Sequence, residues 1–134
     1  MGRIKESSTQ RLNKQESAMV CPVTYIVGKI GGHWKPIILY QLMEGALRYS
    51  ELKRRIPTIT EKMLIQHLKE LQADDLVLRT AEPVVPPFVT YSLTAAGREL
   101  KPVMCAMTEW AIRDRKRRIR QTTAGLSSRT MAAV

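Results

Sequence analysis

Residues 47–73, LRYSELKRRIPTITEKMLIQHLKELQA, contain the pattern that decides the fold. Ser50 and Glu51 supply an N-cap and a first-turn acid, which together predict a short helix over 51–56. Pro57 ends this helix, because proline has no N–H to donate and its ring clashes with the preceding turn. The stretch therefore begins with one short helix and a sharp break.

A second helix, 60–73, follows the proline. Thr58 and Glu61 have the spacing of a capping box, which marks a helix start. Three leucines recur at helical spacing and form one apolar stripe: Leu64, Leu68 and Leu71. Because the other face is mostly polar, the sequence predicts a helix with an apolar back and a solvent-facing front.

Apolar periodicity predicts two more helices before this stretch. Pro22 fits the first turn of a helix over 22–30, and this helix ends at the two glycines that follow it. Residues 34–44 predict a strongly apolar helix, which Gly45 stops. The central pair of helices is thus preceded by another pair.

Extended segments and a long helix complete the chain. Residues 47–49 predict a short extended piece, while 76–80 and 88–93 predict two strands joined by a proline-rich loop. Thr94 caps a final helix over about 95–120. From residue 121 onward, small and polar residues predict disorder.

Length and composition limit the class of protein. A chain of 134 residues with 44% hydrophobic residues predicts one globular domain with tails: a flexible arm over 1–20, the domain over 21–112 and a basic, partly disordered extension over 113–134. Two cysteines exclude a disulfide-framework secreted domain. Neither a stretch of about 18 apolar residues nor an apolar signal region is present, so we expect a cytoplasmic protein with no membrane partner.

Positive charge is concentrated in two segments. The formal net charge is +10, which suits a polyanionic partner such as nucleic acid. Residues 47–69 carry a net charge of +4 and residues 113–134 a net charge of +6, whereas residues 70–112 carry −3. The central helices therefore have the local charge that a nucleic-acid face needs.

The order of these elements is that of a winged helix-turn-helix. A major groove about 12 Å wide admits one helix that has an apolar back and a polar front. Residues 60–73 have that pattern, although an ordinary amphipathic surface helix has it too.

Several separated motifs carry a family resemblance. They are Cys21-Pro22-Val23, Gly31-Gly32-His33-Trp34, Leu47-Arg48-Tyr49-Ser50-Glu51-Leu52, Ile59 to Leu71, Pro86-Pro87 to Leu93-Thr94, and Gly97-Arg98. In order and spacing they resemble the HxlR family of small bacterial and archaeal winged helix-turn-helix transcriptional regulators. The resemblance covers about residues 21–112. It implies an α+β, mostly helical fold with a two-stranded wing and a long C-terminal dimerisation helix.

The resemblance also implies a function. A homodimer paired through terminal helices would bind an operator of two-fold symmetry in double-stranded DNA, with residues 59–71 as the recognition helix and the proline-rich loop as the wing. Two residues depart from the family pattern. Asp75 stands where glycine is usual, so it could serve as a substitute left-handed residue. His67 stands where glutamine is common, and it either faces DNA or packs inward.

The candidate DNA-binding residues fall into two groups. Those expected to face bases lie on the recognition helix: Thr60, Glu61, Lys62, Ile65, Gln66 and Lys69. Those expected to contact phosphate lie in the short extended piece and the short helix: Arg48, Lys53 and Arg54. Arg79 of the wing is expected to touch adjacent phosphates or the minor groove. The alternative is that they form a solvated polar face.

Cys21 is a candidate sensor of oxidants or electrophiles. It precedes Pro22 at a helix N-terminus, where N–H groups and the helix dipole favour a thiolate. Several members of the resembled family sense such compounds through a cysteine at the matching position. The alternative is a buried small hydrophobe, with another effector or none. Cys105 lies beside the apolar stripe of the last helix, where packing near the dimer seam is the expected role.

The last helix supplies the predicted dimer interface, a stripe of Leu100, Val103, Met104, Met107, Trp110 and Ala111. The spacing of the cysteines and histidines predicts no metal site, and we expect no cofactor and no enzymatic activity. The basic run that begins at residue 113 is a solvated face, a phosphate-binding arm or a membrane-surface segment, the last disfavoured by its low apolar content.

The predicted function is sequence-specific regulation of transcription by a homodimer on a palindromic operator. The alternative is a winged-helix module that binds another protein without reading DNA.

Overall fold

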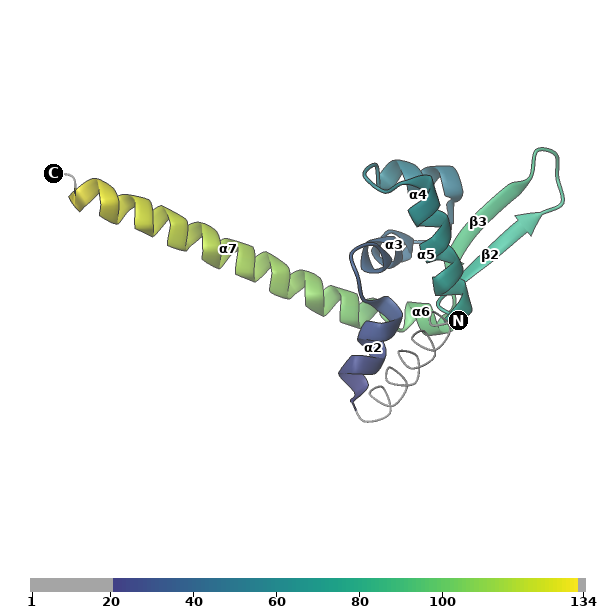
Figure 1. The fold of residues 1–134 in the computed structure, drawn as a ribbon, viewed down its shortest axis with the longest axis horizontal. Helices are drawn as coiled ribbons and strands as arrows, with labels where there is room; N and C mark the ends of the chain where they lie inside the picture. The colour runs from purple at the N-terminus through teal and green to yellow at the C-terminus, as the bar shows by residue number, and fades with distance from the viewer. Residues whose placement is uncertain (1–20, 133–134) are drawn as a thin grey trace, which may run out of the picture. The chain divides into compact units, whose positions relative to one another are not determined.

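The structure, a computed structural model, describes the backbone of residues 21–132 and the side chains of residues 21–128. The predicted flexible arm, 1–20, lies outside the described residues. The elements, in chain order, are α2 (Pro22–Ile30), α3 (Trp34–Leu42), β1 (Leu47–Arg48), α4 (Tyr49–Arg55), α5 (Glu61–Ala73), β2 (Val77–Glu82), β3 (Phe88–Leu93), α6 (Ala95–Arg98) and α7 (Lys101–Ala132) (Figure 1). The chain divides after Glu99 into two compact units.

The first unit has the predicted winged helix-turn-helix fold. Helices α3, α4 and α5 pack together and against a small antiparallel sheet. The core between them is aliphatic, and its side chains are almost completely buried: Ile38, Leu39, Leu42, Leu52, Ile59, Leu64, Leu68 and Leu71. This packing is what fixes the orientation of α5 in the unit, because all three leucines of its predicted stripe belong to the core.

The sheet has three strands in the order β1-β3-β2. Strand β2 pairs with β3 over its whole length, from Val77 opposite Leu93 to Glu82 opposite Phe88. Val77 is the only buried residue of β2, and the buried residues of β3, Tyr91 and Leu93, lie in its second half. The far part of the hairpin therefore projects from the core as the wing (Figure 1). The short extended piece predicted at 47–49 is β1, whose two residues pair with the middle of β3.

A compact junction joins α5, the wing and α6. Asp75 ends the turn after α5 with φ 56°, so it does take the left-handed conformation for which glycine is usual. Its carbonyl oxygen accepts a 2.6 Å hydrogen bond from Thr94 Oγ1, and Thr94 Oγ1 accepts one from the Gly97 N–H. Gly97 lies so close to the Leu76 carbonyl oxygen that a Cβ would clash with it. Thr94 therefore caps α6, as predicted, and its hydroxyl also bonds the end of β3 to the turn before β2.

Two predicted N-caps are wrong by two residues. Helix α4 begins at Tyr49, with Arg48 rather than Ser50 as its N-cap, and the Glu51 carboxylate accepts from the Arg48 N–H at 3.3 Å. Helix α5 is capped by Thr60 rather than Thr58, since the Thr60 hydroxyl accepts from the Met63 N–H at 3.2 Å. In both cases a neighbouring residue occupies the extended position that capping requires.

The C-terminal third also differs from expectation. The helix predicted over 95–120 is two helices, α6 and α7, because Pro102 has no N–H to donate to the Arg98 carbonyl and instead occupies the first turn of α7. Helix α7 then continues through the region from Gln121 that we expected to be disordered, as far as Ala132. The hydroxyls of Thr122 and Thr123 donate back to carbonyls one turn earlier along it.

Candidate nucleic-acid interface

Helix α5 has two chemically different faces. Leu64, Leu68 and Leu71 are buried in the core. The predicted base-reading residues of the opposite face are all exposed: Thr60, Glu61, Lys62, Ile65, Gln66 and Lys69. Ile65, the one aliphatic residue among them, retains 43% of its surface exposed. Four of the six lie within about 100° on the side of the helix opposite the leucines: Lys62, Ile65, Gln66 and Lys69. Glu61 and Thr60 lie at the helix start, Thr60 as the N-cap. We call these six exposed residues the α5 front.

A polar cluster links α5 to α3 beside the α5 front. Lys35 Nζ lies 2.8 Å from Glu70 Oε2, and Gln66 Nε2 donates to Glu70 Oε1 at 3.4 Å. The Lys35 ammonium lowers the pKa of Glu70 below its ordinary value, with a smaller contribution from Gln66. The hydrogen bond to Glu70 restrains the side-chain amide of Gln66 and so limits the rotamers that Gln66 adopts.

His67 is turned inward. Its Nδ1 lies 3.5 Å from Glu70 Oε2, and neither ring nitrogen has a hydrogen-bond partner in the described part of the chain. Of the two roles open from the sequence, contact with DNA and inward packing, the structure shows the second.

The predicted phosphate-contacting residues lie on β1, α4 and the wing. Arg48 and Arg54 are exposed and Lys53 is half-buried. The Arg48 guanidinium lies over the Phe88 ring, 3.7 Å from its centroid, so β1 is tied to the far end of β3 by a cation–π contact. Arg79 is exposed on β2, opposite Tyr91. No feature of the sequence pattern indicated the contact between Arg48 and Phe88, because it depends on strand pairing.

Cys21 is the N-cap residue of α2 and is exposed, not buried. The backbone N–H of Thr24, the Thr24 hydroxyl and the Val23 N–H, in decreasing order of effect, lower the pKa of the Cys21 thiol, although none of them makes a cap hydrogen bond to its side chain. The two N–H groups are among the free ones of a helix N-terminus, which stabilise an anion. Cys105 is also exposed, on α7, and its packing near a dimer seam stays a prediction.

The predicted dimer stripe lies on the first turns of α7. Met104 is buried, whereas Met107 and Trp110 are 49% and 58% exposed. Leu100, Val103 and Ala111 have intermediate exposure. The apolar surface of Met107 and Trp110 is therefore open to a partner.

Two other kinds of site are absent from the described residues. Residues 21–132 contain no helix that is both long enough and apolar enough to cross a membrane. No three histidine, cysteine, aspartate or glutamate side chains in the part of the chain that the structure describes are grouped so that they could hold a metal ion.

Comparison with known proteins identifies the family. The model of the HxlR-like helix-turn-helix family matches residues 29–119, which include the core, the α5 front and the wing. The chain belongs to this family. The resemblance seen in the sequence motifs is confirmed.

Individual proteins are also similar to this chain. The chain is 54% identical, over 81 residues, to the uncharacterized HTH-type transcriptional regulator YkvN of Bacillus subtilis, covering 60% of this chain and 69% of that protein. Two solved structures are also similar: the redox regulator HypR in its oxidized form (46% identity, TM-score 0.65, 67% of this chain and 93% of that chain) and reduced YodB from B. subtilis (37%, 0.62, 68% and 90%). The chain is accordingly a transcriptional regulator of the helix-turn-helix type.

Proposed function

We propose that this regulator acts as a homodimer on a palindromic operator and that oxidants or electrophiles control it through Cys21. The α5 front of each protomer enters a major groove, with α4 and the wing on the adjacent backbone. The two recognition helices are then about 34 Å apart, one turn of the duplex. The function is binding and not catalysis.

The observation that carries the DNA-binding part is the division of α5. Three buried leucines fix the helix in the core, and Lys62, Gln66 and Lys69 are presented in a row on the opposite face. Glutamine can bond adenine through two hydrogen bonds, and lysine can reach guanine or phosphate. A polar face held by a rigid core is what sequence reading requires, because base contacts must be placed with little freedom.

The control by Cys21 rests on its exposure and on the lowered pKa of its thiol. The thiolate is the reactive form, so a larger thiolate fraction at neutral pH speeds oxidation and alkylation. The likeness to HypR, a named redox regulator, supports the same role. Modification at the start of α2 would change how the protomers are arranged, and hence the separation of the recognition helices.

The first experiment is a gel-shift titration of the protein on the DNA upstream of its own gene, with excess competitor DNA, with and without diamide. Specific binding that oxidant abolishes and thiol restores is expected. Specific binding that oxidant leaves unchanged would keep the regulator and reject thiol control. A protein that shows no preference for any tested promoter, but does capture a protein partner, would favour the protein-binding module instead.

The matched variants are Cys21→Ser and Cys105→Ser. We expect Cys21→Ser to bind the operator as the wild type does and to ignore diamide, whereas Cys105→Ser stays sensitive. If Cys21→Ser already lacks operator binding, or if only Cys105→Ser becomes insensitive, the proposed sensor is wrong.

The pKa of Cys21 can be tested directly. In a Cys105→Ser background, the rate of iodoacetamide alkylation should rise with pH around a midpoint below the ordinary thiol value of 9.0, because the polar groups of Thr24 and Val23 at the helix start stabilise the thiolate. The same chain unfolded in urea loses this environment, and its midpoint should move up to the ordinary value. Equal midpoints in the folded and unfolded chains would contradict the lowered pKa.

A further inference from the structure

The middle of α7 carries the densest positive charge in the chain. Six cationic residues stand between 113 and 120, five of them arginines, with Asp114 as the one acid. Asp114 is shared by Arg117 and Arg118, at 3.4 and 3.3 Å. The other four cations have no acidic partner in the described part of the chain: Arg113, Arg115, Lys116 and Arg120.

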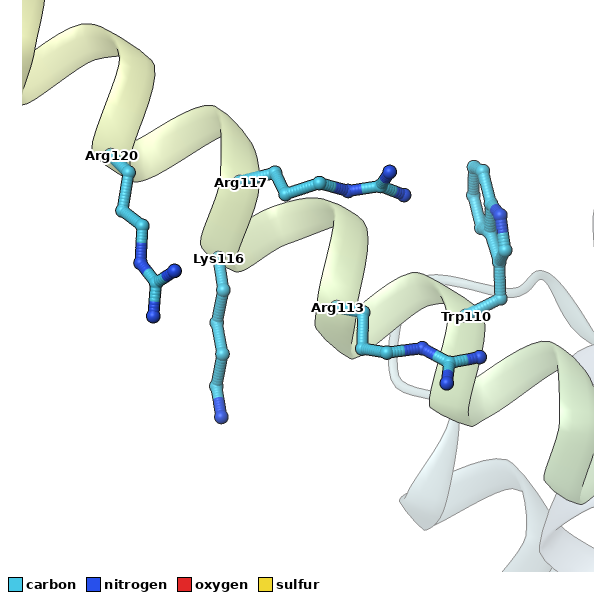
Figure 2. A pocket seen from close by; sticks show the side chains of 5 residues that line it. All are labelled: Trp110, Arg113, Lys116, Arg117 and Arg120. Atoms are coloured by element: carbon cyan, nitrogen blue, oxygen red, sulfur yellow. The ribbon is translucent and has the colours of Figure 1, made fainter.

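Most of this charge lies on one side of the helix. At about 100° per residue, Arg113, Lys116, Arg117 and Arg120 fall within about 100° of the helix circumference. We call these four residues the α7 basic face. Figure 2 shows their side chains on successive turns, with the guanidinium groups of Arg113 and Arg117 extended along the helix in the direction of Trp110. Together with Trp110 they line an open surface pocket of about 520 Å³.

We propose that the α7 basic face binds the phosphate backbone of double-stranded DNA without reading sequence. The inference rests on the proposed function, to which it adds a second contact surface. An arginine guanidinium group can donate two parallel hydrogen bonds to phosphate oxygens, so an arginine-rich face suits phosphate better than a lysine-rich one. From Arg113 to Arg120 the helix rises about 10 Å, which is about three phosphate-to-phosphate steps along the axis of one strand.

The α7 basic face does not coincide with the predicted dimer stripe. By the same helical geometry, the stripe from Leu100 to Ala111 is centred about 130° away around α7. Trp110 stands at the border of the two surfaces. A helix paired through the stripe would therefore leave the α7 basic face open to solvent and to DNA.

A membrane surface fits this helix less well than DNA does. Beyond Trp110, the large apolar side chains that the structure describes as exposed are Ile112, Ile119 and Leu126, one in every seven residues. They form a stripe one side chain wide, whereas a helix that lies in a lipid interface needs a broad apolar face. Self-association of the segment is opposed by its own charge, so an external polyanion is the better partner.

The test compares two double variants of the full chain that remove the same charge. Arg113→Gln with Arg120→Gln alters the α7 basic face, and Arg115→Gln with Arg118→Gln alters residues about 150° from the centre of that face. Glutamine keeps helix propensity close to that of arginine, and circular dichroism checks that helix content is unchanged. Binding of a random-sequence duplex is followed by fluorescence anisotropy between about 50 and 200 mM salt.

We expect the first variant to reduce the slope of log K against log salt by about 1.8 per bound chain, at about 0.9 for each phosphate that the variant no longer neutralises. The second variant should keep nearly the wild-type slope. Equal reductions in both would show that net charge alone acts and would overturn the proposal, as would an unchanged slope in the first variant. Loss of binding to anionic phosphatidylglycerol vesicles with unchanged binding to the duplex would overturn it in favour of lipid.

The same assay separates this inference from the proposed function. The preference for operator over random duplex belongs to the α5 front, and both α7 variants should retain it. A wild-type protein without such a preference contradicts the proposed function, while the slope difference on random duplex still decides the α7 basic face.

Discussion

Helices α5 and α7 both present cations to solvent, but the structure supports them differently. Three leucines of α5 are completely or almost completely buried, so one face is fixed against the core and the other must face outward. Beyond Asp114, every described side chain of α7 is exposed. A helix packed in the core holds its cationic side chains where they can contact particular bases. An exposed helix contributes non-specific electrostatic attraction to phosphate. The comparison predicts that specificity depends on α5 and that non-specific affinity depends on α7.

The largest expected effect is on folding. Leu68→Ala removes a buried side chain from the back of α5 and should lower the free energy of unfolding by about 2–5 kcal/mol, from reduced apolar burial and the cavity left behind. Ile119→Ala removes an exposed side chain of α7, where we expect a change within about 0.5 kcal/mol. Urea denaturation of both variants measures the difference. Similar losses would mean that α7 is packed as firmly as α5.

The next effect is on sequence reading. Lys62→Ala with Gln66→Ala should reduce the preference for operator over random DNA, by about 1–3 kcal/mol for each base that the variant no longer reads. Lys53→Ala with Arg54→Ala should instead weaken binding to both DNAs about equally, because phosphate contacts position the protein and do not read bases. Competition binding on the two DNAs gives both quantities. If the α4 variant lost the preference and the α5 variant kept it, the recognition surface would have to be reassigned to α4.

The smallest effect concerns the polar cluster beside the α5 front. Lys35→Met should lower the free energy of unfolding by about 0.5–1 kcal/mol at neutral pH, because the pair is partly exposed. Lys35 lowers the pKa of Glu70, so the stabilisation is present above the ordinary carboxyl pKa and is lost as the pH falls through the lowered one. The difference between the variant and wild type should therefore shrink in acid.

Lys69→Met serves as the control for this pair. Lys69 is an exposed lysine of the α5 front with no acidic partner among the described residues. Its replacement should change stability little at any pH. A pH-independent loss in Lys35→Met would show that the Lys35 side chain acts by packing and not by its charge on Glu70.

The sequence predicted the elements whose signals are local. The stripe of Leu64, Leu68 and Leu71 placed α5, and the hydroxyl of Thr94 placed a helix start, because both act over one or two turns. The α5 front followed from the same periodicity, since a buried stripe defines the opposite face. Asp75 was identified as a left-handed residue because it stands where the family has glycine.

Other features depend on contacts that no local pattern records. The pairing of β1 with β3 joins residues more than forty positions apart, and the contact between Arg48 and Phe88 depends on it. Pro102 carried the signal that would have separated α6 from α7, since proline is common in the first turn of a helix. The continuation of α7 past Gln121 has no equivalent signal, because its small polar residues are compatible with helix and with coil alike.

The junction at Leu76 has a consequence for measurements in solution. The Leu76 N–H donates to the Leu71 carbonyl, and the Thr94 N–H donates to the Leu76 carbonyl, so both amides lie where α5, the wing and α6 meet. Their protons should exchange with deuterated solvent only when the whole first unit opens, whereas the exposed tip of the wing opens on its own. These two amides would therefore report global stability, and a deuterium label at the wing tip would report DNA contact alone.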